Sequence, residues 1–286
     1  MPELPEVQTT VDGLNKTVKG LEVVGVSTEY NSPSHLGRDN IKDPKFFAYF
    51  RKKVKGQKIL KAERRAKNIL IHLSNGFTIL VHMKMTGHFF YNFPKETKYL
   101  RLIFHLSNGK SLGFSDLRKF AKVTLIETNK LKESLHISHL GPEPLSLDFT
   151  FPVLESRLSK RPRAKIKTAL MDQTLVSGVG NIYADETLWL AGVHPLSIVE
   201  KIPEERLKLI FKGMKQVLRK GIDFGGDSTS DYRNIHGEKG QFQGKHNAYR
   251  KTKTKCQKRG CLGIIERIMV GPRSAHFCPK HQRLYK

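Results

Sequence analysis

The chain has 286 residues, of which 51 are Lys or Arg and 26 are Asp or Glu, so its formal net charge is +25. This length predicts about two domains, and a hydrophobic content of 38% is enough for a core without disulfide bonds. The sequence has no run of about 18 apolar residues and no signal-peptide pattern, so we expect neither a membrane span nor secretion.

The first 20 residues predict a short helix. Pro5 suits the first helical position. Apolar residues then recur at helical spacing from Val7 to Val18. Gly20 can end the helix.

From Leu21 to about Thr128 the pattern changes to that of an antiparallel β-sandwich. Asn75-Gly76 and Asn108-Gly109 each separate two apolar runs, which is the strongest short signal for a hairpin. The expected strands are Leu21–Ser27, Asn68–Leu73, Phe77–Met83, Leu100–Leu106, Lys110–Phe114 and Lys122–Ile126.

After Gly141-Pro142 the sequence predicts helices at Ile166–Met171, Asn181–Ala191 and Glu204–Lys220, the last closed by Gly221. A Gly-rich polar stretch from Gly225 to about Lys255 predicts a mobile loop and an extended segment. The expected fold is therefore α+β. We expect a β-sandwich over residues 1–135, a linker over 136–150, a helical domain with the loop over 151–245, and a small module over 246–286.

The C-terminal part carries much of the charge. Between Arg233 and Lys286 there are 14 Lys or Arg and two acids, Glu238 and Glu266. Several glycines interrupt this segment, so it does not form the basic amphipathic helix of a membrane-surface protein. A nucleic acid is the expected partner, with a merely solubilising basic surface as the alternative.

The three cysteines of the chain lie together near its end. Cys256 and Cys261, then Cys278 and His281, form two ligand pairs around a short apolar stretch with a turn at Gly271-Pro272. Paired ligands on a hairpin suit tetrahedral zinc, whose binding free energy can fold a module that is too small for its own core. We expect one structural zinc ion, with three incidental buried thiols as the alternative.

Pro2 is a candidate nucleophile if the initiator methionine is removed. A free proline nitrogen is a secondary amine that can attack an aldehydic carbon and form an iminium. Glu3 lies next to that amine and can transfer protons. Alone, this spacing is weak evidence, because prolines near a chain start are common.

Several motifs in one order resemble the bacterial formamidopyrimidine-DNA glycosylase family. The match runs from Pro2 to His281, and Leu4 and Val7 favour this family over its sister, endonuclease VIII. The motifs are MPELPEV at Met1–Val7, RRAK at Arg64–Lys67, DLRKF at Asp116–Phe120, HLGPEPL at His139–Leu145, LMD at Leu170–Asp172, GVGNIYA at Gly178–Ala184 and the terminal cysteine module.

The resemblance implies a bifunctional DNA glycosylase and abasic-site lyase that excises 8-oxoguanine and formamidopyrimidines. It implies that Pro2 attacks C1′ of the damaged nucleotide and forms a Schiff base, followed by β- and δ-elimination. Glu3 matches the acid that transfers protons. Lys67 matches the lysine near the reacting sugar, although an exposed edge-strand lysine is the ordinary reading of that residue.

The resemblance also implies DNA-binding residues. Met85, Arg118 and Phe120 match the side chains that fill the void left by a flipped base, although Met85 and Phe120 also suit a core. Asn181 begins a helix after a glycine turn and matches a phosphate-binding residue of a helix–two-turns–helix motif. Arg273 matches the zinc-finger arginine at the lesion. The segment Gly225–Phe242 matches the loop that closes over the flipped base.

The sequence departs from the family pattern at several positions. The first cysteine pair has four intervening residues instead of two, and the fourth ligand is His281 instead of cysteine. A DNA-contacting histidine of the family falls near Tyr99. A basic phosphate-binding residue falls near Arg161 to Arg163, and Arg163 is our candidate. Gln8 stands where glutamate is usual.

The expected partner is double-stranded DNA with oxidised bases or abasic sites, bound by a monomer in the bacterial cytoplasm at the nucleoid. One alternative is a glycosylase for oxidised pyrimidines, as in the sister branch. A second is a DNA-binding zinc protein without catalysis, against which the combination of Pro2, Glu3 and Lys67 argues.

Overall fold

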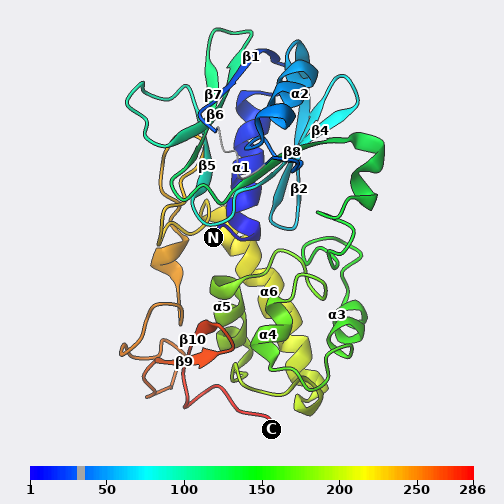
Figure 1. Cartoon of the computed structure of the whole chain (residues 1–286). Coiled ribbons are helices and arrows are strands. Elements are labelled where there is room, and N and C mark those ends of the chain that lie inside the picture. Colours follow the sequence, from blue (N-terminus) through cyan, green and yellow to red (C-terminus); the bar gives the residue numbers. More distant parts are fainter. Residues whose placement is uncertain (31–35) are drawn as a thin grey trace. The chain divides into compact units, whose positions relative to one another are not determined.

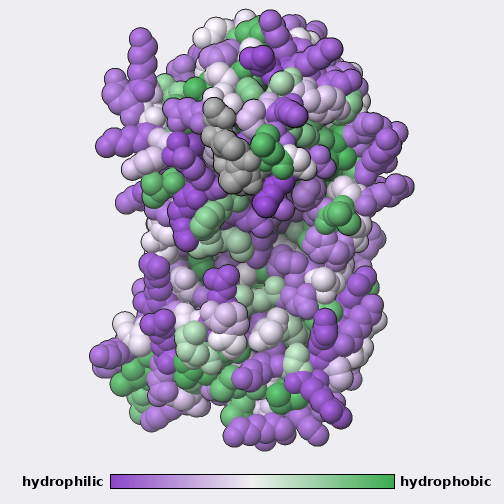
Figure 2. Space-filling model, viewed as in Figure 1, coloured by the Kyte–Doolittle hydropathy of each residue, from purple (hydrophilic) through white to green (hydrophobic). Residues whose placement is uncertain are grey.

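The computed structural model describes residues 1–30 and 36–286, which form two compact units. The first unit contains Met1–Ser138 and Phe224–Gln241, and the second contains His139–Asp223 and Phe242–Lys286. In the part of the chain that is described, no helix is long and apolar enough to cross a membrane. Hydrophilic side chains cover most of the face drawn in Figure 2, as the 27% charged content predicts.

The first unit is built on an eight-stranded antiparallel sheet with the order β5-β7-β6-β1-β2-β3-β4-β8 (Figure 1). Its two halves are joined by a short β1–β2 pairing, Glu22 with Lys58 and Val23 with Gln57. The strands are β1 (Glu22–Thr28), β2 (Gln57–Arg65), β3 (Asn68–Leu73), β4 (Phe77–His82), β5 (Gly87–Tyr91), β6 (Leu100–Leu106), β7 (Ser111–Asp116) and β8 (Lys122–Glu127).

Helix α1 (Leu4–Thr17) lies between the two halves of this sheet (Figure 1). Its apolar stripe, Val7, Val11 and Leu14, is buried in the same core as side chains of both halves. Beyond Lys58, β2 is no longer paired with β1, and the side chain of Asn15 in α1 supplies hydrogen bonds to its backbone instead. Its amide donates to the Ala62 carbonyl at 2.9 Å and accepts from the Ala62 N–H at 2.8 Å.

The six predicted strands of this unit are confirmed to within one or two residues at their ends. Helix α2 (Pro44–Val54) and the strands β2 and β5 were not predicted. Strand β2 reads QKILKAERR and buries only two of its nine residues, Ile59 and Ala62, so it lacks the apolar alternation that identifies a strand. The 3-10 turn η2 (Thr128–Glu133) follows β8.

The second unit contains the helices α3 (Phe151–Leu158), α4 (Ile166–Met171), α5 (Asn181–Ala191) and α6 (Glu204–Asp223), with short 3-10 turns at Val199–Lys201 and Phe242–Lys245. The prediction that Gly221 ends α6 is wrong. Gly221 is buried within the helix, whereas Gly225 has a φ of +67° and follows its end. The predicted hairpin is confirmed as β9 (Glu266–Val270) and β10 (Arg273–Phe277).

The first part of the Gly-rich segment after α6 belongs to the first unit, and two of its apolar side chains are buried there. Ile235 is 2% exposed and belongs to the core of that unit, and its carbonyl accepts from the Tyr91 N–H at 2.8 Å. Tyr232 is also buried. The burial of Tyr232 and Ile235 could not be predicted from the sequence, because two apolar residues in a Gly-rich polar stretch give no periodic signal.

Candidate functional site

Pro2 and Glu3 immediately precede α1, and both are buried. Glu6 fixes this start of the helix, because one of its carboxylate oxygens accepts from the Glu3 N–H at 2.7 Å. Its other oxygen accepts from the Asp227 N–H at 2.7 Å. One buried carboxylate therefore holds the backbone at Glu3 and the segment that follows Gly226. Gly226 has a φ of +85°, and a Cβ atom at this position would lie 3.0 Å from the side chains of Glu6 and Tyr232. The position therefore favours glycine.

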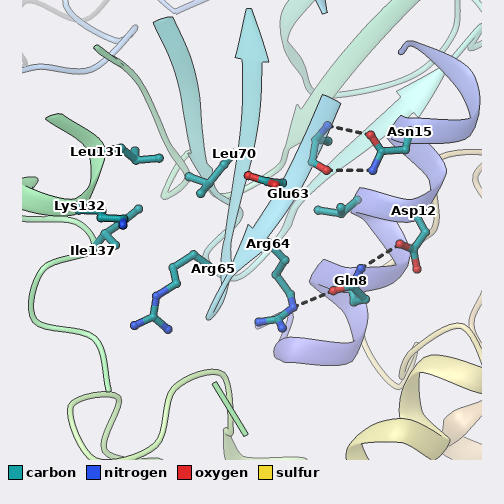
Figure 3. Close-up of a pocket in the computed structure, with 12 residues that line it drawn as sticks. Gln8, Asp12, Asn15, Glu63, Arg64, Arg65, Leu70, Leu131, Lys132 and Ile137 are labelled. Carbon is teal, nitrogen blue, oxygen red and sulfur yellow. Dashed lines mark hydrogen bonds between the residues drawn. The ribbon is translucent and has the colours of Figure 1, made fainter. Parts of the chain in front are cut away.

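Lys67 lies in the turn between β2 and β3 and is 6% exposed. Ala66 before it has a φ of +54°, the left-handed conformation that a tight turn needs here. Arg64 ties this turn to α1, because its Nε donates to Gln8 Oε1 at 3.0 Å (Figure 3). Its Nη1 donates to the Ala66 carbonyl at 3.1 Å. Gln8 in turn donates to Asp12 at 2.8 Å. The turn with Lys67 is thus braced against the helix that Pro2 precedes.

His82 was not predicted as a site residue, yet it lies beside this turn. It is paired with Asn68 across β3 and β4, and its Nδ1 accepts from the Lys84 N–H at 3.0 Å. Burial, together with the positive charges of Lys84, Lys67 and Lys122, lowers the pKa of His82 to about 3. The imidazole is therefore a neutral hydrogen-bonding group within a cluster of lysines.

The low pKa of His82 predicts a pH dependence of stability. Between its folded value of about 3 and its ordinary value of 6.5, the unfolded chain binds a proton that the folded chain does not. The free energy of unfolding should therefore fall as the pH decreases through this window, by up to about 1.4 kcal/mol per pH unit. A His82→Gln variant should lose this part of the slope, and His236→Gln, at an exposed histidine, should retain it. An NMR titration of His82 with a midpoint near 6.5 would contradict the assignment.

Met85 lies outside the core. Val81 and Met83 are buried within the sheet core, but β4 ends at His82 and Met85 sits half-buried in the turn that follows. Lys84, with a φ of +53°, and the hydrogen bond from the Gly87 N–H to the Met83 carbonyl at 3.0 Å shape this turn. The side chain of Met85 is therefore accessible, as contact with DNA would require.

Arg118 and Phe120 stand on an exposed turn whose two ends are held by Asp116. This carboxylate is fully buried, accepting from Thr86 Oγ1 at 2.6 Å and from the Ala121 N–H at 2.8 Å. Thr86, next to Met85, also accepts from the Arg118 N–H at 3.1 Å. The Arg118 guanidinium lies 4.7 Å from the centre of the Phe120 ring, and Phe120 is 52% exposed. One acid therefore joins the Met85 turn to the turn with the cation and the aromatic ring.

The backbone of Tyr99 is bound to Asp116, the residue that holds the Arg118 turn. Its carbonyl accepts from the Asp116 N–H at 3.0 Å, its φ is +61°, and its ring is 48% exposed near the Arg101 guanidinium. The exposed ring gives this position an aromatic surface where the family pattern leads us to expect histidine.

In the second unit, Asn181 is the first residue of α5 after the turn at Gly178, whose φ is +85°. Gln173 braces this turn, because it accepts from the Gly178 N–H at 2.9 Å and donates to the Val179 carbonyl at 2.8 Å. The side-chain oxygen of Asn181 is buried and has no hydrogen-bond partner among the described residues. A helix start with an unused polar group suits an anionic ligand. Arg163 is exposed in the turn between α3 and α4.

Arg273 is exposed at the start of β10. A buried ion pair holds the strand: Lys167 Nζ lies 2.6 Å from Asp185 Oδ1 and donates to the Ser274 carbonyl at 2.6 Å. Asp185 Oδ2 accepts from the His276 N–H at 2.9 Å. Because the side chains of Lys167 and Asp185 are 1% or less exposed, removal of either one would leave a buried charge without its partner. This pair was not identified from the sequence.

The four predicted metal ligands are brought together. Ligand atoms of Cys256, Cys261, Cys278 and His281 all lie within 4.8 Å of one another. The Cys261 and Cys278 sulfurs are 3.6 Å apart, near the distance of about 3.8 Å expected for two thiolates on one tetrahedral zinc ion. His281 Nδ1 faces Cys256 Sγ at 3.2 Å, and its Nε2 lies 3.0 Å from the Trp189 carbonyl. The donor set therefore fits zinc, with Nδ1 as the ligand atom.

Two of these thiols have shifted pKa values. The Gly263 N–H, which donates to Cys261 Sγ at 3.3 Å, lowers the pKa of that thiol. Burial raises the pKa of Cys278 to about 11. A metal must therefore displace a proton from Cys278, since the thiolate is the form that binds zinc.

Comparison with known proteins gives full-length matches. The model of the formamidopyrimidine-DNA glycosylase N-terminal domain matches residues 1–123, and the model of the formamidopyrimidine-DNA glycosylase H2TH domain matches residues 140–233. The formamidopyrimidine-DNA glycosylase of Bacillus subtilis is 37% identical over 284 residues, with 99% of both chains covered. That of Ruegeria sp. is 34% identical over 293 residues, which cover 99% of this chain and all of the relative.

Solved structures give the same result. A Lactococcus lactis FPG mutant in complex with Fapy-dG containing DNA has a TM-score of 0.86 at 32% identity, with 97% of this chain and 98% of that chain covered. The Lactococcus lactis Fpg in complex with DNA containing an abasic site has a TM-score of 0.85 at 31% identity, with the same coverage.

Proposed function

Because the chain belongs to the formamidopyrimidine-DNA glycosylase family, we infer that it is a DNA glycosylase of base excision repair that removes oxidised purines and cleaves the resulting abasic site. The substrates proposed are 8-oxoguanine and formamidopyrimidines in double-stranded DNA. Pro2 carries this proposal: after removal of Met1, its nitrogen is a secondary amine next to the buried acid Glu3, at the fixed start of α1.

In the proposed reaction the Pro2 nitrogen attacks C1′ of the damaged nucleotide, and the bond between C1′ and the base breaks. The base leaves with its bonding electrons and takes up a proton, and loss of the ring oxygen from C1′ yields an iminium. The iminium then accepts the electrons released on loss of a proton from C2′. The 3′ C–O bond breaks in β-elimination and the 5′ C–O bond in δ-elimination.

We assign the proton transfers to Glu3, the buried acid that follows Pro2 in the sequence. Lys67 would lie near the reacting sugar and its phosphate. Its turn is braced by Arg64 and Gln8 and shares a cluster of positive charge with Lys84 and Lys122. Such a cluster favours binding of an anion and stabilises negative charge that develops on a leaving phosphate.

A base within a duplex cannot reach Pro2, so the nucleotide must flip out of the stack. Met85, Arg118 and Phe120 are proposed to fill the space that the base leaves. Their turns are tied together by Thr86 and Asp116, and a thioether, a guanidinium and an exposed ring can replace lost stacking and hydrogen bonds. Tyr99, on the same cluster, and Asn181, Arg163 and Arg273 of the second unit are proposed to contact the DNA backbone.

One structural zinc ion is proposed for the Cys256, Cys261, Cys278 and His281 site, where it would supply the free energy that folds the β9–β10 hairpin. The hairpin presents Arg273. We expect the protein to act as a monomer on chromosomal DNA, and therefore in the bacterial cytoplasm at the nucleoid.

Substrate preference is tested by excision assays on two duplexes, one with 8-oxoguanine opposite cytosine and one with thymine glycol. The proposal predicts faster excision of 8-oxoguanine and a covalent adduct after borohydride reduction. Preference for thymine glycol would assign the chain to oxidised pyrimidines. DNA binding without excision or adduct on either duplex would show a protein without catalysis.

Replacement of Arg273 by Ala should weaken binding to DNA with an abasic-site analogue, because a phosphate contact is lost. The slope of log affinity against log salt should decrease by about 0.9 for that contact. Arg219→Ala, at an exposed arginine of α6, is the matched control and should leave the slope unchanged. An Arg273→Ala protein with the wild-type slope would rule out the contact.

A further inference from the structure

A cationic pocket in the first unit is lined in part by the Arg118 turn. Its volume is about 700 Å³, within the range of sites that hold a small molecule or part of a chain. Five cations line it, and Asp39 is the only acid among its lining residues in the described part of the chain. The cations are Arg38, Lys42, Arg118, Lys119 and Lys122.

These cations influence one another. Burial lowers the pKa of Lys42, and the neighbouring charges of Lys122 and Arg38 lower it further, although the buried Asp116 opposes them. Lys122 also lowers the pKa of Lys84 and of His82. Positive potential thus extends from the Lys67 turn to this pocket. Like charges held this close destabilise the fold unless an anion neutralises them.

Lys42 connects two parts of the pocket wall through its contacts. Lys42 is only 6% exposed, its Nζ donates to the Lys119 carbonyl at 2.5 Å, and it lies 5.5 Å from the centre of the Tyr30 ring. The Lys42 N–H donates to Asn40 Oδ1 at 3.2 Å. Lys119 itself has a φ of +55°, so Lys42 supports the turn at its most constrained residue. The turn that presents Arg118 and Phe120 is therefore held from the pocket side as well as by Asp116.

The residues that line the pocket indicate which DNA strand it binds. Pro2 and Lys67 are proposed to act on the damaged strand. Arg118 is proposed to fill the space left by the flipped base, which places it opposite the base that stays in the other strand. The same turn that presents Arg118 lines the pocket. On this basis, which rests on the proposed function, we propose that the pocket formed by Arg38, Lys42 and Lys122 binds a backbone phosphate of the undamaged strand.

The test replaces single phosphates with neutral methylphosphonates, one position at a time, in each strand of a duplex with a tetrahydrofuran abasic analogue opposite cytosine. Affinity is measured by fluorescence anisotropy at fixed salt. Wild-type protein should lose about tenfold in affinity at one or two positions of the undamaged strand near the lesion, as expected for loss of a charge-assisted hydrogen bond.

Variants identify the pocket. Arg38→Ala and Lys122→Ala remove exposed side chains, so the fold should be retained, as circular dichroism can check. Each should weaken binding, and each should be insensitive to the methylphosphonate that weakens wild-type binding. Arg51→Ala and Lys19→Ala remove equal charges at exposed positions of the same unit and should keep the wild-type sensitivity.

A scan without a sensitive position in the undamaged strand would overturn the proposal, as would Arg38→Ala and Lys122→Ala proteins that keep the wild-type pattern. The proposal would also be overturned if the methylphosphonate position to which Arg38→Ala and Lys122→Ala become insensitive lies in the damaged strand. The analogue is not cleaved, so the assay is independent of catalysis. Failure of borohydride trapping in the wild type would contradict the proposed function, whereas a flat scan with intact trapping contradicts only this pocket.

Discussion

An N-terminal extension that remains attached before Met1 should abolish covalent trapping on DNA with 8-oxoguanine. The extension keeps the Pro2 nitrogen in an amide, whose lone pair is delocalised and cannot attack C1′. Excision should fall by roughly 10³-fold or more, the scale of losing a covalent nucleophile. Single-turnover excision and borohydride trapping measure the two effects.

The same extension placed after Lys286 is the matched control and should leave both activities intact. Binding to the tetrahydrofuran duplex reports whether the N-terminal extension merely blocks access to DNA. If the extended chain binds this duplex and still forms the adduct at the wild-type rate, Pro2 is not the nucleophile.

Loss of the metal site should have the second large effect. His281→Ala leaves three sulfur ligands, so zinc content should fall from one ion per chain, and affinity for the tetrahydrofuran duplex should fall by about 100-fold or more. The reason is that the β9–β10 hairpin, which carries Arg273, depends on a metal free energy of about 10–16 kcal/mol. Zinc analysis and anisotropy measure the two quantities.

Two variants make this result specific. His281→Cys keeps four ligands and should keep the metal and the affinity, whereas His105→Ala changes an exposed histidine outside the cluster and should change neither. The strands of the first unit should remain folded in His281→Ala, as hydrogen exchange can show. Global unfolding on loss of the metal would contradict a metal site whose stabilising effect is limited to the hairpin.

Much of the fold could be predicted because local signals agree with the tertiary structure. Asn-Gly turns mark two hairpins, and α4 and α5 begin and end at the predicted residues. Strand β2 was not predicted because part of its backbone hydrogen-bonds to the Asn15 side chain of α1 and because only two of its nine residues are buried. Asn15 and Ala62 are 47 residues apart, so their hydrogen bonds give no local pattern in the sequence.

The candidate site was predictable where the chemistry of a residue type is specific. Three cysteines and a histidine at ligand spacing could be identified as one metal site, and the structure brings them together. The residues that hold a site could not be found in this way. Asp116, Gln173 and Lys167 act through buried hydrogen bonds to distant backbone, and such pairings depend on the fold.

Gln8 shows how a departure from the family pattern can be explained by the structure. An amide there accepts from Arg64 and donates to Asp12, so it links two groups of opposite charge. A carboxylate could accept from Arg64 but could not donate to Asp12. The exchange therefore preserves the brace on the Lys67 turn through a different set of hydrogen bonds.

The proposed mechanism requires a covalent bond between the Pro2 nitrogen and C1′ of the damaged nucleotide. Wild-type protein should be reduced with borohydride on 8-oxoguanine DNA, digested with protease and nuclease, and sequenced by tandem mass spectrometry. We predict one sugar-derived mass on the N-terminal peptide, located on Pro2, with Met1 absent. A sugar attached to a lysine, or an active chain that retains Met1, would contradict the mechanism.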